Sequence, residues 1–252
     1  MNRKRLITAF SVVALLGGGV LAVYAAEGFN QAKPFIYDPA KTRLVQGTWL
    51  DGIGCPTGAK VAIYPATSPT GAFTAAGCTT GDSSDKNNQG LLLVKTGPLL
   101  NNASAGAVLK NVKGITLTEL GYDLRKPGAD QNDARGSHCG AGAARFNVTT
   151  SDGFWFVGCN SPAPTVTASG DGWMRLRWTS PTGYKDGVTL SPITGTVRSI
   201  SIVFDEAQVD SGPDNFGLAI IDNIDVNAAL VGSGKAGEHS DSKDKEGDSD
   251  DD

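Results

Sequence analysis

The sequence predicts an all-β fold: a single two-layer antiparallel β-sandwich, most simply a jelly roll. Glycine is abundant, with 33 of 252 residues, which favours many short strands joined by tight turns. Residues 173–178 and 196–204 each alternate apolar and polar side chains, the pattern of antiparallel strands with one buried face. Residues 90–96 form a continuous apolar run of strand length, which is typical of a central strand buried on both faces.

The first half of the domain contains three further candidate segments. Residues 43–50 alternate as a first strand, and a long turn-rich stretch follows at 51–89. Residues 105–112 fit no single pattern. Residues 114–125 alternate, but the apolar face switches near Glu119, which predicts a β-bulge or two shorter strands there.

The second half contains the clearest hairpin, at residues 145–158. Its turn is Ser151-Asp152-Gly153, and Asp-Gly is a strong turn signal. We interpret the aromatic return arm, 154–157, as core. Residues 218–226 then form the closing strand.

The chain divides into four segments. Residues 1–25, with a basic start and an apolar run, are predicted to be a signal peptide, so the protein is expected to be secreted or held at the cell surface. An uncleaved membrane anchor is the alternative for this run. Residues 26–42 are interpreted as a lead-in, 43–231 as the sandwich and 232–252 as an acidic, disordered tail. No second apolar stretch reaches membrane-spanning length.

Charge is unevenly distributed along the chain. The net charge is −4, of which the last 20 residues contribute −5 through three lysines and eight acids. The signal segment contributes +3, which leaves −2 for the body of the protein. A nearly neutral body argues against a nucleic acid partner, because phosphate binding needs a dense basic surface.

Four cysteines in an exported chain predict disulfide bonds, with three possible connectivities. The most economical pairing joins Cys55 with Cys78 and Cys139 with Cys159. A zinc site is disfavoured because C-x-x-C spacing is missing and His138 is the only histidine outside the tail.

The closing strand carries one residue that breaks its apolar pattern, Asp222. It is expected on the core-facing side, together with Leu218, Ile220, Ile224 and Val226. A buried carboxylate needs a cation or several hydrogen-bond donors. We therefore consider a structural calcium site formed by Asp222 with Asp205 and Glu206. The alternative is that backbone N–H groups or an arginine such as Arg145 satisfy Asp222.

A second candidate site lies on the polar side of the strand at 173–178. Trp173, Arg175 and Arg177 share this face, and an exposed indole beside two guanidinium groups could stack on a sugar ring or hold an anion. The alternative is an ordinary solvated sheet face with Trp173 partly covered by a loop.

Catalytic arrangements find little support. Ser137 and His138 are neighbours in sequence, but no G-x-S-x-G elbow accompanies them. Glu119 and Asp123 are acids with nothing to place them in a cleft. A non-catalytic protein is therefore expected, although catalysis stays open.

Two blocks resemble known exported proteins. Residues 204–206 and 217–227, which contain Ile-Asp-Asn-Ile-Asp-Val-Asn, resemble the end of bacterial jelly-roll domains of the carbohydrate-binding or galactose-binding-like kind. Residues 139–148 are similar to a piece of exported bacterial proteins of unassigned function. The resemblance implies that Asp222 helps to hold a structural calcium ion.

Together these observations lead us to expect a non-catalytic exported module that binds a carbohydrate or cell-surface polymer. A structural or adhesive surface protein without a specific ligand is the first alternative. A polysaccharide-acting enzyme is the second.

Overall fold

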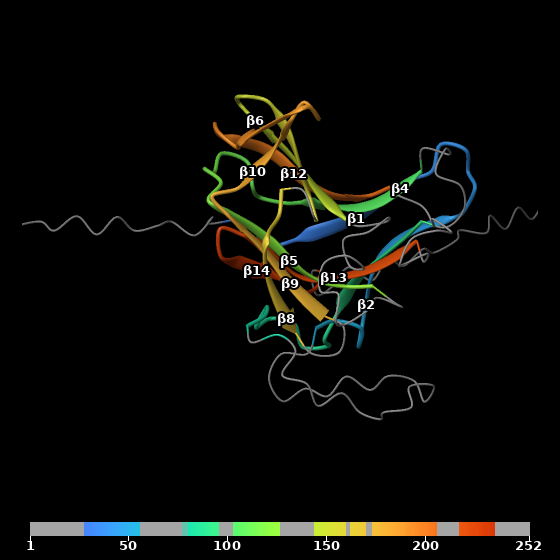
Figure 1. Cartoon of the computed structure of the whole chain (residues 1–252). Coiled ribbons are helices and arrows are strands. Elements are labelled where there is room, and N and C mark those ends of the chain that lie inside the picture. Colours follow the sequence, from blue (N-terminus) through green and yellow to red (C-terminus); the bar gives the residue numbers. More distant parts are fainter. Residues whose placement is uncertain are drawn as a thin grey trace, which may run out of the picture.

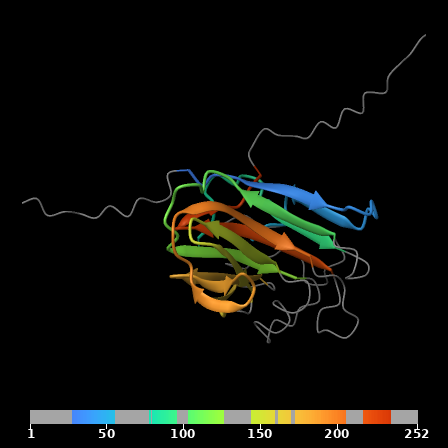
Figure 2. The ribbon, with the colours of Figure 1, turned by 90° about the horizontal axis from the view of Figure 1, so that it is seen from above.

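The computed structural model consists of two antiparallel β-sheets stacked as a sandwich, so the predicted fold class is confirmed. Figure 1 shows the two layers, and Figure 2 views the strands from above. The structure describes residues 28–55, 78, 80–95, 103–126, 144–159, 162–169, 173–205 and 217–234. The predicted signal peptide and most of the acidic tail lie outside these ranges. No helix in the described residues is long and apolar enough to cross a membrane.

The first sheet, sheet A, has seven strands in the order β1-β4-β12-β6-β7-β10-β11. Their bounds are β1 Ala32–Tyr37, β4 Ser104–Leu109, β12 Val197–Phe204, β6 Arg145–Thr150, β7 Phe154–Gly158, β10 Thr182–Lys185 and β11 Thr189–Pro192.

The second sheet, sheet B, follows the order β2-β3-β13-β5-β9-β8, with β14 added beside β13. Their bounds are β2 Val45–Leu50, β3 Gly90–Lys95, β13 Leu218–Val226, β5 Glu119–Arg125, β9 Trp173–Thr179, β8 Thr165–Ser169 and β14 Ala229–Val231.

Successive strands cross repeatedly between the two sheets, as in a jelly roll. Strand β4 lies in sheet A, β5 in sheet B, β6 and β7 in sheet A, and β12 and β13 again in different sheets. Strands β12 and β13 both occupy interior positions of their sheets, although only β14 follows them in the chain. This arrangement brings β13 against β3 and β5, and β12 against β4 and β6.

The hydrophobic core fills the space between the sheets and includes an aromatic cluster from both layers. Tyr122 of β5 and Trp178 of β9 meet Phe146 of β6, with ring centroids 5.3 to 5.9 Å apart. The Tyr122 hydroxyl donates to the Ala144 carbonyl at 2.7 Å, which satisfies a phenol in an otherwise dry core. These contacts join sheet A directly to sheet B.

Several sequence-predicted elements match the structure, and others shift. The hairpin at 145–158 is formed by β6 and β7. The ambiguous segment at 105–112 contributes β4, and the alternating segment at 114–125 is interrupted, so that β5 begins at Glu119. Part of the expected lead-in is an edge strand, β1, so sheet A begins before residue 43.

The Cys55–Cys78 disulfide is present, with Cα atoms 5.9 Å apart. It closes the turn-rich stretch between β2 and β3, as the spacing predicts. Cys159 is buried and also disulfide-bonded. Its predicted partner, Cys139, lies outside the described residues.

Strand β13 contains a β-bulge that overturns the predicted facing of its side chains. Its register with β5 shifts between Asp222 and Asp225, where Asn223 has a φ of 44°. Ala219 and Ile221 face the core before the bulge, and Ile224 and Val226 face it afterwards. Ile220 instead packs against the disulfide on the outer face. The expectation that Asp222 points into the core is wrong: it is buried, but on the outer side of sheet B.

We expect the double variant Cys55→Ser/Cys78→Ser to lose about 3 kcal/mol of unfolding free energy, because the bond closes a loop of roughly twenty residues in the unfolded chain. Urea unfolding followed by circular dichroism measures the loss. Because Cys159 is also disulfide-bonded, the control for the substitutions themselves compares the double variant with the wild type when both are fully reduced. Unfolding curves that coincide for the oxidised protein and the double variant would contradict the expectation.

Candidate functional site

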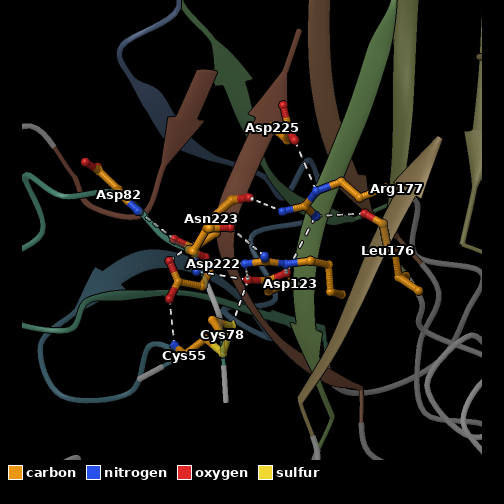
Figure 3. A network of polar contacts seen from close by, with 11 residues as sticks. Cys55, Cys78, Asp82, Asp123, Leu176, Arg177, Asp222, Asn223 and Asp225 are labelled. Carbon is orange, nitrogen blue, oxygen red and sulfur yellow. Dashed lines mark hydrogen bonds and ion pairs between the residues drawn. A yellow bond between two sulfur atoms is a disulfide. The ribbon is translucent and has the colours of Figure 1, made fainter. Parts of the chain in front are cut away.

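The outer face of sheet B carries a buried charge network (Figure 3). Its members come from three adjacent strands. The charge network is defined as Asp123 of β5, Arg175 and Arg177 of β9, and Asp222, Asn223 and Asp225 of β13. Asp123 lies directly opposite Asp222 on one neighbour and Arg175 on the other. Strand register therefore places three acids and two arginines side by side.

Asp123 is the centre of the network and is fully buried. Arg175 Nε and Nη2 donate to its two oxygens at 2.9 Å, a bidentate ion pair. Asn223 Nδ2 donates to the same carboxylate at 2.9 Å. Arg177 lies between Asp123, at 3.5 Å, and Asp225, at 3.0 Å. A Cβ on Gly121 would lie 2.3 Å from Arg177 Cδ, so the glycine leaves room for this arginine.

Asp222 is held by backbone donors rather than by an arginine. Its Oδ2 accepts from Cys55 N at 2.6 Å and its Oδ1 from Asn223 N at 2.6 Å. Burial, with the neighbouring Asp123 carboxylate, raises the pKa of Asp222 well above its usual range. These contacts match the alternative in which backbone N–H groups satisfy the Asp222 carboxylate. Arg145 does not reach it, because that arginine pairs with Asp205.

A loop covers this face and is fastened to the network. Arg175 Nη1 donates to Thr80 Oγ1 at 2.7 Å, and Asp82 N donates to Asn223 Oδ1 at 2.9 Å. The Cys55–Cys78 disulfide packs with Ile220 against Trp173. Trp173 is only 2% exposed. The expectation of an exposed indole is therefore wrong, and Trp173 is covered, as in the alternative that places a loop over it. The side chains of Arg175 and Arg177 are 13% exposed.

The proposed metal-binding acids do not meet in the described contacts. Asp205 follows β12 of sheet A, where its carboxylate forms an ion pair with Arg145. Asp222 lies in sheet B, and Glu206 lies outside the described residues. Cys55, Cys78 and Asp123 do place three ligand-type atoms within 4.8 Å of one another. Both sulfurs belong to the disulfide, so they are not thiolate ligands.

The outer face of sheet A differs because aromatic rings remain partly exposed on it. Trp155 and Val157 of β7 are buried, so Phe154 and Phe156 point the other way. Phe156 is paired with Asn147 of β6.

The strand register extends this pair into a cross-strand row. On the hairpin side, Phe156 is paired with Tyr184 of β10, which is paired with Leu190 of β11. On the other side the register runs from Asn147 to Ser201 of β12. We call the line through these positions, Lys33, Val108, Ser201, Asn147, Phe156, Tyr184 and Leu190, the cross-strand row.

An ion pair stands beside this row. Arg145 Nη2 donates to Asp205 Oδ2 at 2.5 Å, and Nη1 donates to Oδ1. Arg145 Nε donates to Asn147 Oδ1 at 3.3 Å, and its Cζ lies 5.4 Å from the centre of the Phe156 ring. The side chains of Arg145 and Asp205 are 25% and 34% exposed. Aromatic, amide and charged groups thus meet at one accessible surface.

Phe154 and Phe156 are absent from the sequence-predicted sites because the return arm of the hairpin is interpreted there as core. The signal that identifies them is the apolar character of four consecutive residues in an isolated hairpin arm. In an alternating strand, such a run places rings on both faces. One face of this arm must then present aromatic side chains away from the core.

No protein-family model matches the sequence, and no curated protein matches it. Among solved structures, the chain is similar to the family 11 carbohydrate-binding module of the cellulosomal cellulase Lic26A-Cel5E of Clostridium thermocellum, with a TM-score of 0.35 and 13% identity over 82% of this chain and 91% of that one. It is also similar to a family 11 module from Clostridium thermocellum in complex with a β-1,3-1,4-mixed-linked tetrasaccharide, with a TM-score of 0.32 and 14% identity over 81% and 98% of the two chains. The fold assignment rests on the two sheets themselves.

We expect the charge network to make stability fall as pH rises from 5 to 8. Burial raises the pKa of Asp225 to about 6, although Arg177 partly offsets the rise. Because this pKa lies above that of an unfolded Asp, the protonated carboxyl favours folding, and its contribution is lost as pH passes through about 6. The loss amounts to about 1 kcal/mol over this interval.

Asp225→Asn should make the loss of stability between pH 5 and 8, measured by urea unfolding at each pH, smaller than in the wild type; the raised pKa of Asp222 leaves a remainder. Asp186→Asn, at an exposed turn, is the matched control and should follow the wild type. Parallel curves for all three proteins would contradict the assignment of the pH dependence to Asp225.

Proposed function

We propose that this protein is an exported, non-catalytic glycan-binding module whose binding surface is the outer face of sheet A. The observation that carries the proposal is the accessible set of Phe154, Phe156 and Tyr184 beside the amide of Asn147. Aromatic rings bury the apolar faces of a sugar, while a few amides and charged groups hydrogen-bond its hydroxyls. Trp173, the aromatic residue expected in this role, is covered.

The rigidity of the surface supports binding. Phe156 and Asn147 lie on paired strands of a seven-stranded sheet whose inner face packs on the core. Side chains held on strands lose less freedom on binding than side chains on loops. A preorganised surface suits a flexible polymer, because the polymer itself already loses conformational freedom when it binds.

The positions of the acids favour binding over hydrolysis. Asp186 N donates to the Phe154 carbonyl, whereas Asp205 pairs with Arg145, which lies opposite Gly158. Phe154 and Gly158 are four positions apart on strand β7, so their backbones lie about 13 Å apart at the usual rise. Catalytic carboxylate pairs of glycosidases are about 5 to 9.5 Å apart.

An adhesive surface protein without a specific ligand is the remaining alternative. It predicts no saturable binding of defined oligosaccharides. The surface on sheet A favours a specific ligand because its partly exposed rings lie beside hydrogen-bonding groups and would lose water when a ligand covers them.

Binding to a glycan array should be saturable for the wild type and at least tenfold weaker for Phe156→Ala and for Tyr184→Ala. Thr165→Ala, at an exposed position of sheet B, is the matched control and should bind normally. Circular dichroism establishes that each variant is folded. A wild type that binds no glycan, or aromatic variants that bind as tightly as the control, would reject the proposal.

We further propose calcium as a structural ion beside Asp222. The oxygens there suit it: a Cβ on Gly232 would lie 2.7 Å from Asp222 Oδ1 and 3.0 Å from Asn223 Oδ1, next to Asp82. Carboxylate and amide oxygens are the ligands that calcium prefers. Burial and then the neighbouring Asp123 carboxylate raise the pKa of Asp222, and a bound cation would offset both by stabilising the ionised carboxylate. Asp205 has no part in this site, because it pairs with Arg145.

A calcium site at Asp222 predicts that a chelator lowers the melting temperature of the wild type by several degrees and that added calcium restores it. Asp222→Asn should abolish the response, whereas Asp205→Asn should retain it. Calorimetric titration with calcium measures binding directly. Melting curves that do not change in chelator, with no heat of binding, would exclude the ion.

A further inference from the structure

From the outer face of sheet A we infer that its ligand is an uncharged linear glycan, bound across the strands through an internal stretch of its chain and contacted by the Arg145–Asp205 pair. This inference rests on the proposed glycan-binding function. It adds the charge of the ligand, its direction on the sheet and the part of the polymer that is bound.

The uncharged character follows from the partners of Arg145. Both terminal nitrogens donate to Asp205, and Nε donates to Asn147. An anionic sugar would have to displace the Asp205 carboxylate from this arginine or approach it against charge repulsion, and either costs free energy. A neutral hydroxyl can instead add to the pair at its exposed side, because carboxylate oxygens accept more than one hydrogen bond.

The other central positions of the cross-strand row agree with this charge. Ser201, Asn147, Phe156 and Tyr184 are all uncharged. Lys33 lies at the far edge of the row, on β1. The middle of the face therefore has hydrogen-bonding groups and aromatic rings without net charge.

The direction of the ligand follows from the ring geometry. Phe154 and Phe156 succeed each other along β7, but their planes meet at 86° with centroids 4.6 Å apart. Two perpendicular rings cannot both lie flat against the same chain. Phe156 and Tyr184 are cross-strand partners, so their shared line runs perpendicular to the strands. A ligand stacked on them crosses from β10 towards β12.

The two ends of the cross-strand row indicate that the site binds an internal stretch of the polymer. Seven strands at the usual spacing make the row roughly 29 Å long. Within the described residues it ends at exposed side chains on both edges, Lys33 on β1 and Leu190, 53% exposed, on β11. A glycan can thus continue past either edge, and its ends need no recognition.

Titration calorimetry with neutral and anionic polymers tests the charge of the ligand. Uncharged β-glucan, xylan and mannan form one set, and polygalacturonate and chondroitin sulfate form the other. We expect binding to at least one neutral polymer, little change between 50 and 500 mM salt, and no binding to the anionic set. Tighter binding of an anionic polymer with a steep salt dependence overturns the inference but leaves glycan binding intact. Absence of binding to both sets overturns the proposed function as well.

Asp205→Asn tests the role of the ion pair. It leaves the Asp205 backbone, which accepts from Lys95, unchanged and frees the arginine charge. We expect at least fivefold weaker neutral binding and measurable binding of polygalacturonate, with Asp186→Asn unchanged and Asp205→Glu partly restored. Equal neutral affinity in Asp205→Asn and the wild type overturns the role of the pair.

Oligosaccharides of the bound polymer test the direction and the internal mode. Affinity should rise at least tenfold from the disaccharide to the hexasaccharide, and blocking both chain ends should leave hexasaccharide affinity unchanged. Leu190→Ala at the row edge should weaken the hexasaccharide more than the disaccharide. Loss of affinity on blocking either end, or equal affinity at all lengths, overturns internal binding.

Discussion

The bulge at Asn223 in strand β13 determines which side chains the last strand presents to each side of sheet B. Without the extra residue, strict alternation after Ile221 would turn Asn223 and Asp225 into the core. With it, Ile224 and Val226 occupy those core positions, and Asp225 reaches Arg177 on the outer side. Asparagine tolerates the positive φ required here better than most residues do. The integrity of the core and the charge network both depend on this local geometry.

We interpret the charge network as fixing one arrangement of the covering loop rather than as a source of stability. Buried ion pairs gain little over apolar packing, because the desolvation of each charge offsets the Coulomb attraction. Here the charged groups also bind a loop: Thr80 accepts from Arg175, and Asp82 N donates to Asn223. Their directional bonds hold this loop in one position over sheet B. The disulfide reduces the number of conformations that the unfolded loop can adopt.

The two outer faces consequently have opposite characters. On sheet B the loop and the disulfide cover Trp173 and the arginines, so charged residues lie in a nearly dry layer. On sheet A, Phe156 and the Arg145–Asp205 pair remain accessible. A face that is already covered gains nothing from a ligand, whereas accessible rings do gain by losing water. This contrast is why we propose sheet A as the ligand surface.

Local pattern in the sequence determined the sandwich and the hairpin at 145–158, and it favoured the pairing of Cys55 with Cys78, because alternation, Asp-Gly turns and short cysteine spacing act between near neighbours. It also placed Trp173, Arg175 and Arg177 on one face. Only the tertiary structure decided that this face is covered, since Thr80 of the covering loop lies 95 positions before Arg175. The same holds for Asp222, which the bulge places on the opposite side from Ile224 and Val226, and for Phe156, whose exposure depends on what packs over each sheet. Periodicity gives the faces of a strand; long-range packing decides which of them meets water.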